Sequence, residues 1–395
     1  MSACLKDLFW LEQVSKISFS CLRQQYSDSV LTRLDTLITF IGNLFAKDHK
    51  FKLVESIVTT NYLKISKDVV TMARRILLLL LSTLALASAF VPKPSLTRKA
   101  PLPIDTSAQA STPMMMIPRG GAAAFLTTSV ELLTNSLQSG PWGVVGLWAV
   151  SSAVVIPFTL YRQAYSFSVG YGYSVMAMAL VLLQVFGGCS PLTSAAVFYG
   201  ARLGSYLLLR NIIVPSKGEQ TKSFDKIFPR VKRIPFAASV ALFYALLMTP
   251  VLYVLRNGSS AGGRVLQVGT VIAWAGALLE AVADTHKLII NRNVTDKKTF
   301  VGPTGGLYGI TRHPNYAAEI LFWFGLLVAG VPSFGKSITA WVCSGLGFYG
   351  IYGIMTNATK RLNKKQLENY GGDEVYDKWR AQVKAPLFPF VNSAE

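Results

Sequence analysis

Charged residues are scarce in this 395-residue chain, and acidic residues are the scarcest of them. Asp, Glu, Lys and Arg make up 15% of the sequence, whereas a soluble domain carries about a quarter. Only 20 acidic residues stand against 39 basic ones, so the formal net charge is +19. The basic residues alternate with long apolar runs and form no soluble basic face. This pattern excludes a nucleic-acid reader and favours an integral membrane protein with basic loops.

Cysteine and histidine are too few and too scattered to build a zinc site or a disulfide framework. The four cysteines form no CxxC pair, and the three histidines are far apart, so we predict no metal. The chain also lacks a GxGxxG motif after a strand, which excludes a Rossmann domain. The Gly-rich segment GPTGGLYG, residues 302–309, is interpreted as a flexible re-entrant turn.

The first part of the chain, residues 1–71, mixes charges with short apolar patches and contains no run long enough to span a membrane. Residues 72–92, MARRILLLLLSTLALASAFVP, have the layout of a secretory signal peptide, with basic residues, an apolar run and a small-residue end. We expect translation to start at Met72, which makes residues 1–71 an artefact of the predicted gene. The alternative is an internal membrane helix after a small N-terminal domain.

The second part, residues 72–121, has the features of a signal plus transit peptide. Its stretch ASAFVP (87–92) resembles the cleavage motif of the two-part plastid-targeting sequences of algae with secondary plastids. Residues 93–121 are rich in Ser, Thr, Pro, Lys and Arg and contain one acid, which is transit-peptide composition. An ordinary disordered linker has the same composition. We expect the protein in a plastid or endoplasmic reticulum membrane.

The third part, residues 122–395, is predicted to be the membrane domain. A helix needs about 20 apolar residues to cross a bilayer, and the stretches that qualify are 141–161, 170–187, 192–213, 235–256, 265–290, 317–335 and 337–358. Residues 122–138 are expected to form a further, interfacial helix. The sequence therefore predicts an all-α, polytopic transmembrane helix bundle of about seven spans.

Three polar segments are expected on one face of this bundle. They are the basic loop 214–234, the polar loop 291–316 and the basic tail 359–395, and two spans separate each from the next. The positive-inside rule places their face toward the cytosol or stroma.

Three of the predicted spans carry polar residues, which are costly at membrane depth and usually functional. Each set recurs at helical spacing and so lies on one face of its helix. The sets are Tyr199, Arg202, Tyr206 and Arg210; Glu280, Asp284, Lys287 and Asn291; and Tyr316 with Glu319, preceded by Arg312 and His313. All lie near the ends that face the polar segments, which predicts a polar cavity open to one side. The alternative is buried ion-pair stripes that orient the helices, with basic side chains near span ends snorkelling to the interface.

The residue types at this predicted cavity suit a phosphorylated dinucleotide. The forked guanidinium groups of arginine, and a histidine, suit phosphates. Aspartate, glutamate and asparagine suit ribose hydroxyls and amides. A phosphorylated dinucleotide needs both kinds of partner.

The segment RHPNYAAEILFWFG, residues 312–325, resembles membrane reductases of the steroid 5-alpha-reductase type, in which an Asn-Tyr-x-x-Glu core opens a late membrane helix. Three further segments are similar to that family: FYGARLGSYLLLR (198–210), LEAVADTHKLIINR (279–292) and YGGDEVYDKWRAQVKAPLFPF (370–390). The resemblance covers roughly residues 141–390. It implies an all-helical membrane fold that binds NADPH in a cytosol-facing cavity and reduces a carbon–carbon double bond in a membrane lipid, such as a sterol or isoprenoid.

The same resemblance implies the roles of individual residues. Asn315 and Glu319 would hold the nicotinamide end of NADPH, and Asp284 and Tyr316 would line the same pocket. The other cofactor-binding candidates are Arg202, Arg292, Arg312, His313, Tyr376 and Arg380. We predict Tyr316 as the proton donor, with Glu319 as the second catalytic residue. The Tyr and Glu that polarise the carbonyl in true steroid reductases lie on early helices, and no motif places that pair here. The resemblance therefore does not specify a steroid as the substrate.

Two other interpretations remain open. The isoprenylcysteine carboxyl methyltransferases also carry Arg-His-Pro-x-Tyr and a Tyr-rich tail before Pro-Phe, and they bind S-adenosylmethionine. They usually have a Gly-containing segment where this chain has Ala317-Ala318-Glu319, and a Glu-Glu pair where it has Asn363-Lys364-Lys365. The reductase is therefore the preferred hypothesis. A non-catalytic membrane relative that keeps the fold is the third.

Overall fold

The computed structural model describes residues 122–188, 190–225, 229–257, 263–291 and 299–389. Within these ranges the chain forms ten α-helices, α5 to α14, and no strand, which confirms the predicted all-α fold. The predicted extension 1–71 and targeting segment 72–121 lie outside the described residues, as does Arg292.

Six of the helices are long and apolar enough to cross a membrane, as expected of a multi-pass integral membrane protein. They are α6 (Gly143–Tyr161), α7 (Val169–Phe186), α10 (Arg233–Asn257), α11 (Gly263–Asn291), α12 (Pro314–Phe334) and α13 (Ile338–Tyr370). The seventh predicted span is also a helix, α8 (Pro191–Ile213). It is not among the six because Arg202, Arg210 and small polar residues reduce its apolar character. The predicted interfacial helix corresponds to α5 (Ala122–Gln138).

Helices α7 and α8 pack closely because each presents glycine to the other. A Cβ added at Gly172 would overlap the backbone of Gly204, and one added at Gly200 would overlap the backbone of Met176. Since the order of these contacts reverses along the chain, the two helices are antiparallel. Small residues that let backbones approach are the usual means of helix association in membranes, where no hydrophobic force drives it.

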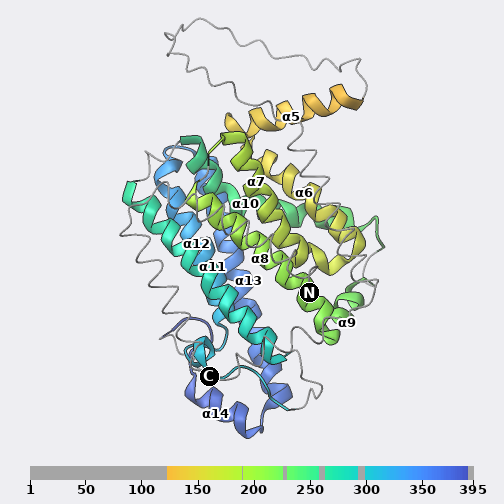
Figure 1. Cartoon of the computed structure of the whole chain (residues 1–395), viewed down its shortest axis with the longest axis vertical. Coiled ribbons are helices and arrows are strands. Elements are labelled where there is room, and N and C mark those ends of the chain that lie inside the picture. The colour runs from red at the N-terminus through yellow and green to blue at the C-terminus, as the bar shows by residue number, and fades with distance from the viewer. Residues whose placement is uncertain (1–121, 189, 226–228, 258–262, 292–298, 390–395) are drawn as a thin grey trace, which may run out of the picture.

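Helices α11 and α12 use the same device and lie side by side in Figure 1. A Cβ at Gly269 would overlap Ala329, and a Cβ at Gly276 would overlap the backbone of Phe322. This close antiparallel contact fixes the register between Glu280 and Asp284 on α11 and the beginning of α12. The polar residues of the two helices therefore meet.

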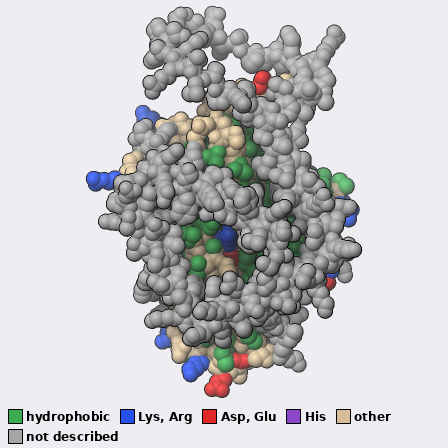
Figure 2. Space-filling model, in the orientation of Figure 1, with side chains coloured by type: hydrophobic (Ala, Val, Ile, Leu, Met, Phe, Trp, Pro, Cys, Tyr) green, Lys and Arg blue, Asp and Glu red, His purple; other side chains and the backbone are tan. Residues whose placement is uncertain are grey.

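The direction of α10 completes the alternation of spans. At one end of α6, the Arg233 side chain lies 3.5 Å from the carbonyl oxygen of Thr159. At the other end, Arg256 donates to the carbonyl of Gly140 at 2.9 Å. Helices α6 and α10 are therefore antiparallel, and the C-terminal ends of α6, α8, α11 and α13 lie on one face of the bundle. We call it the polar face; Figure 2 shows charged side chains at the end of the molecule where α14 lies.

The polar face contains more helix than the sequence predicts. The segment 214–234, predicted as a loop, contains the ten-residue helix α9 (Pro215–Phe224). Helix α13 continues to Tyr370, well beyond the predicted end of the last span, and α14 (Glu374–Gln382) follows it. The Gly-rich segment ends in a short 3₁₀ turn, η4 (Gly306–Gly309). Proline at the first turn of α9, as at the first turn of α12, supplies a φ angle suited to starting a helix.

Candidate functional site

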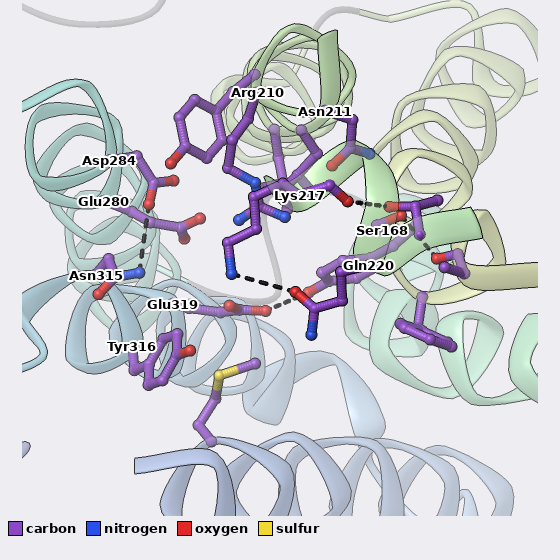
Figure 3. Close-up of a pocket in the computed structure, with 18 of the residues that line it drawn as sticks. Ser168, Arg210, Asn211, Lys217, Gln220, Glu280, Asp284, Asn315, Tyr316 and Glu319 are labelled. Atoms are coloured by element: carbon purple, nitrogen blue, oxygen red, sulfur yellow. Dashed lines mark hydrogen bonds between the residues drawn. The ribbon is translucent and has the colours of Figure 1, made fainter. Parts of the chain in front are cut away.

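A cavity of about 330 Å³ opens among α7, α8, α9, α11 and α12 at the polar face. Its size is at the lower end of the range of small-molecule sites, about 300–1,000 Å³. The polar lining residues include Ser168, Tyr171, Tyr206, Arg210, Asn211, Lys217, Gln220, Glu280, Asp284, Asn315, Tyr316 and Glu319. Figure 3 shows the labelled residues converging from helices far apart in the sequence.

The inner wall of the cavity is an ion-pair cluster between α8 and α11. Arg202 lies 2.9 Å from Glu280 and 2.7 Å from Asp284, and both carboxylates are buried. The spacing of four residues puts the two acids on one face of α11, where one guanidinium reaches both. Arg202 was predicted to bind a cofactor phosphate, but the structure places it against these carboxylates. Its charge is therefore already compensated.

Helix α12 brings its first two turns to the same wall. The Asn315 side-chain amide donates to Asp284 over 3.3 Å, and Glu319 lies one turn further along. Asn315 and Glu319 are four residues apart, so both face the cavity. The structure thus brings together Asp284, Asn315, Tyr316 and Glu319, as the sequence predicts.

Tyr171 of α7 is a cavity residue that the sequence analysis missed. Its hydroxyl donates to Glu319 Oε1 at 2.8 Å and accepts from the indole nitrogen of Trp323 at 2.7 Å. A second buried tyrosine, Tyr199, lies 3.3 Å away, oxygen to oxygen. The only sequence signal was a tyrosine within an apolar span, since a buried phenol usually needs a hydrogen-bond partner. The partner, Glu319, is 148 residues away.

Basic side chains line the mouth of the cavity. Arg210 comes from the last turn of α8, and Lys217 and Gln220 come from α9. In Figure 3, Lys217 projects across the opening, where its amine donates to Gln220 at 3.3 Å. Although Lys217 retains contact with solvent, partial desolvation at the mouth lowers its pKa to about 8, and repulsion from Arg210, Lys287 and Lys365 adds to the shift. The mouth is therefore electropositive, while the inner wall is rich in carboxylates.

Three polar atoms of the lining are buried and lack a hydrogen-bond partner within the described residues. They are the side-chain oxygen of Asn315, one carboxylate oxygen of Glu280 and the Nε of Arg210. Buried polar groups are almost always satisfied, and an unsatisfied one costs about 1–3 kcal/mol. A polar ligand bound in the cavity would satisfy these three atoms.

Arg312 and His313 do not line the cavity. Their backbone amides donate to the carbonyls of Ala385 and Pro386 at 3.0 and 3.1 Å, which attaches the tail to the beginning of α12. The His313 ring lies 2.7 Å from the side-chain oxygen of Asn363. Burial lowers the pKa of His313 to about 4, so the ring is neutral at pH 7 and offers no positive charge to a phosphate.

Two more predicted residues, Tyr376 and Arg380, belong to α14 and are not in the cavity lining. Tyr376 is buried against Phe300 and Trp379 in a small apolar cluster of the tail. The indole of Trp379 also donates to the carbonyl of Tyr308 at 2.9 Å, which ties α14 to η4. The packing of the tail thus explains the burial of Tyr376 without a bound ligand.

No group of three or more His, Cys, Asp or Glu side chains is placed to hold a metal ion within the part of the chain that the structure describes.

The sequence profile of one protein family, described as a protein of unknown function (DUF1295), matches residues 167–383. This match covers more than half of the chain. The chain belongs to this family. Its members are membrane proteins related to steroid 5-alpha-reductase-like proteins. The matched segment begins two residues before α7 and ends one residue after α14, so it contains every residue that lines the cavity except Ala164. No curated protein and no solved structure matches the chain.

Proposed function

We propose that this protein is a membrane oxidoreductase that uses NADPH to reduce a carbon–carbon double bond in a membrane lipid, such as a sterol or an isoprenoid. The observation that carries the proposal is the set of unsatisfied polar atoms around one cavity, on Asn315, Glu280 and Arg210. An amide oxygen, a carboxylate and a guanidinium suit a carboxamide, a ribose hydroxyl and a phosphate respectively. NADPH contains all three groups.

The fit assigns a role to each part of the site. Asn315 would accept a hydrogen bond from the carboxamide, and Glu280 would accept one from a ribose hydroxyl. Arg210 and Lys217 at the mouth would neutralise phosphates. A cavity of about 330 Å³ suits the nicotinamide end and its ribose rather than the whole cofactor. S-adenosylmethionine carries no phosphate, so the basic mouth favours NADPH over the cofactor of the methyltransferase alternative.

Reduction of a double bond needs a proton as well as a hydride, and bound NADPH would supply the hydride. Three tyrosines line the cavity: Tyr171, Tyr206 and the predicted donor Tyr316. The Tyr316 ring stacks on His313 with centroids 5.7 Å apart. The Tyr171 hydroxyl is held by Glu319 and Trp323. When Glu319 is protonated, it can donate to the Tyr171 oxygen and leave the phenol proton free to face the cavity. We therefore favour Tyr171 as the proton donor, with Glu319 as the residue that returns the proton.

The membrane that holds the protein is part of the proposal. A plastid or endoplasmic reticulum membrane follows from the targeting features of residues 72–121 alone, which lie outside the described residues. In either membrane, we place the polar face and its cavity on the stromal or cytosolic side, because that face carries the basic segments.

The test of the proposed function compares two cofactors on the full-length protein in detergent. A ligand that binds only the folded state raises stability by about 2.7 kcal/mol at a concentration about 100 times its Kd. We expect NADPH to raise the Tm in a saturable manner and S-adenosylmethionine to leave it unchanged. Stabilisation by S-adenosylmethionine alone would support the methyltransferase alternative. Stabilisation by neither would favour the non-catalytic relative.

The shifted pKa of Lys217 predicts a pH dependence of NADPH affinity. Lys217 is charged below a pH of about 8 and loses its charge above it, whereas an ordinary lysine stays charged to about pH 10. An exposed ion pair contributes up to about 1 kcal/mol. The Kd for NADPH should therefore rise up to about fivefold between pH 7 and pH 9, as measured by isothermal titration.

The control for this effect is Lys217→Arg, which keeps its charge at all these pH values. Lys217→Arg should bind NADPH with the same affinity at pH 7 and pH 9. Lys217→Gln should bind weakly at both. A steep pH dependence that survives in Lys217→Gln would assign the titration to another group.

A further inference from the structure

A second cavity, of about 380 Å³, lies at the polar face between the end of α6 and the beginning of α10. Its lining consists of Tyr161, Arg162, Asp225, Arg230 and Arg233. It shares no lining residue with the first cavity. The proposed reductase chemistry does not use it, so its charged residues need a separate explanation.

The centre of this cavity is a preorganised network around Asp225, the residue that follows α9. The Asp225 carboxylate lies 2.9 Å from Arg162 and 3.1 Å from Arg233, and it accepts from the backbone amide of Gln163 at 2.8 Å. Arg233 also donates to the Asp225 carbonyl at 2.7 Å and is almost fully buried. Two guanidinium groups are therefore fixed in position before any ligand arrives.

Basic residues predominate in the lining of this cavity. The lining contains three arginines and one aspartate. Arg230 is exposed and has no carboxylate partner within the residues that the structure describes. Fixed guanidinium groups bind phosphate through paired N–H donors more effectively than lysines do. The cavity is thus suited to a phosphate group.

The surroundings distinguish a lipid phosphate from a soluble one. Exposed apolar and aromatic side chains flank the arginines at the ends of two membrane-spanning helices: Tyr161, Val231, Ile234 and Phe236. Aromatic residues at such positions mark the membrane–water boundary. Basic pockets between transmembrane helices on this side of a membrane bind anionic lipid headgroups. A lipid in this position would keep its acyl chains against the apolar side chains.

We propose that the cavity lined by Arg162, Arg230 and Arg233 binds the phosphate of an anionic phospholipid headgroup. The site is separate from the proposed cofactor cavity and does not depend on the proposed reaction. Asp225, which follows α9, holds two of the arginines of this site, while Lys217 and Gln220 of α9 line the first cavity.

The test uses the full-length protein in a neutral detergent, with native mass spectrometry as the readout. Phosphatidylglycerol, phosphatidylcholine and inorganic phosphate serve as the three probes. We expect saturable binding of phosphatidylglycerol and much weaker binding of phosphatidylcholine. Each basic residue near an anionic membrane surface contributes about 1 kcal/mol, so Arg230→Gln should weaken phosphatidylglycerol binding about fivefold. Arg230→Glu should abolish it.

The matched control is Lys232→Gln, which removes one charge from an exposed residue of the same turn that does not line the cavity. It should bind phosphatidylglycerol as the unmodified protein does. Arg230 is exposed, so its variants should keep the lipid-free Tm, which separates lost binding from lost folding. Equal binding by Arg230→Glu and the unmodified protein would overturn the proposal. The proposal would also be overturned if inorganic phosphate bound with the same dependence on Arg230 and phosphatidylglycerol were not preferred. The site would then bind free phosphate rather than a lipid headgroup.

Discussion

A Tyr171→Phe variant is expected to lose a hundredfold or more of its lipid reduction rate while it still binds NADPH. Positioned general acids contribute about 10²–10⁴ to rates, and the Tyr171 hydroxyl is the best-held phenol in the cavity. Its oxygen lies 2.8 Å from Glu319, so the substitution removes both the donor and its link to the carboxyl group. The measurement is NADPH oxidation in detergent with a total membrane lipid extract as substrate, together with the Kd for NADPH.

The control is Tyr173→Phe on the same helix. Tyr173 is also buried, and its hydroxyl lies 3.2 Å from Ser205, but it does not line the cavity. Tyr173→Phe should keep most of the activity. If Tyr171→Phe stayed active and Tyr316→Phe did not, the donor would be Tyr316. If both single variants stayed active, neither tyrosine would be the proton donor.

An Asn315→Ala variant is expected to lose NADPH binding by at least about tenfold and to remain folded. The Asn315 side-chain oxygen is buried without a partner among the described residues, so a cofactor carboxamide that satisfies it gains a hydrogen bond in a dry site. A buried hydrogen bond contributes about 0.5–1.5 kcal/mol, and the unsatisfied cofactor group would cost a further 1–3 kcal/mol. The bond from Asn315 to Asp284 is long, at 3.3 Å, so its loss should destabilise the fold only slightly.

This prediction is measured as the NADPH-dependent rise in Tm and as the Kd by isothermal titration. Asn357→Ala, at an exposed position of α13, is the matched control and should respond to NADPH normally. If Asn315→Ala bound NADPH with unchanged affinity, the carboxamide would not bind Asn315. The main support for the cavity as the nicotinamide site would then be lost.

Much of the bundle could be predicted from the sequence because membrane helices are determined by local composition. Long apolar runs leave a helix as the only way to satisfy the backbone in lipid, and the seven predicted spans correspond to helices. The acids on α11 could be predicted as one stripe because their spacing of four is local. The same holds for Asn315 and Glu319 on α12. Periodicity therefore identified the inner wall of the cavity.

The rest of the site depends on contacts between distant segments, which periodicity does not encode. Tyr171 became part of the site only through its side-chain hydrogen bonds with Glu319 and Trp323 of α12. Lys217 was predicted as a loop residue, whereas α9 folds back and places it over the cavity. Arg312 and His313 looked like ligands because they are polar and precede a span. Their backbone amides attach the tail, and neither residue lines the cavity.

The central claim is that electrons pass from NADPH to a lipid, and label transfer tests it most directly. Membranes containing the full-length protein would be incubated with NADPH deuterated at the nicotinamide C4, using both C4 stereoisomers, and the extracted lipids would be analysed by mass spectrometry. We predict one deuterium from the cofactor and one hydrogen from water in a lipid that has lost a double bond, and no such product with Tyr171→Phe. Lipids that carry no deuterium would contradict the proposed reduction. Transfer of a labelled methyl group from S-adenosylmethionine would support the methyltransferase instead.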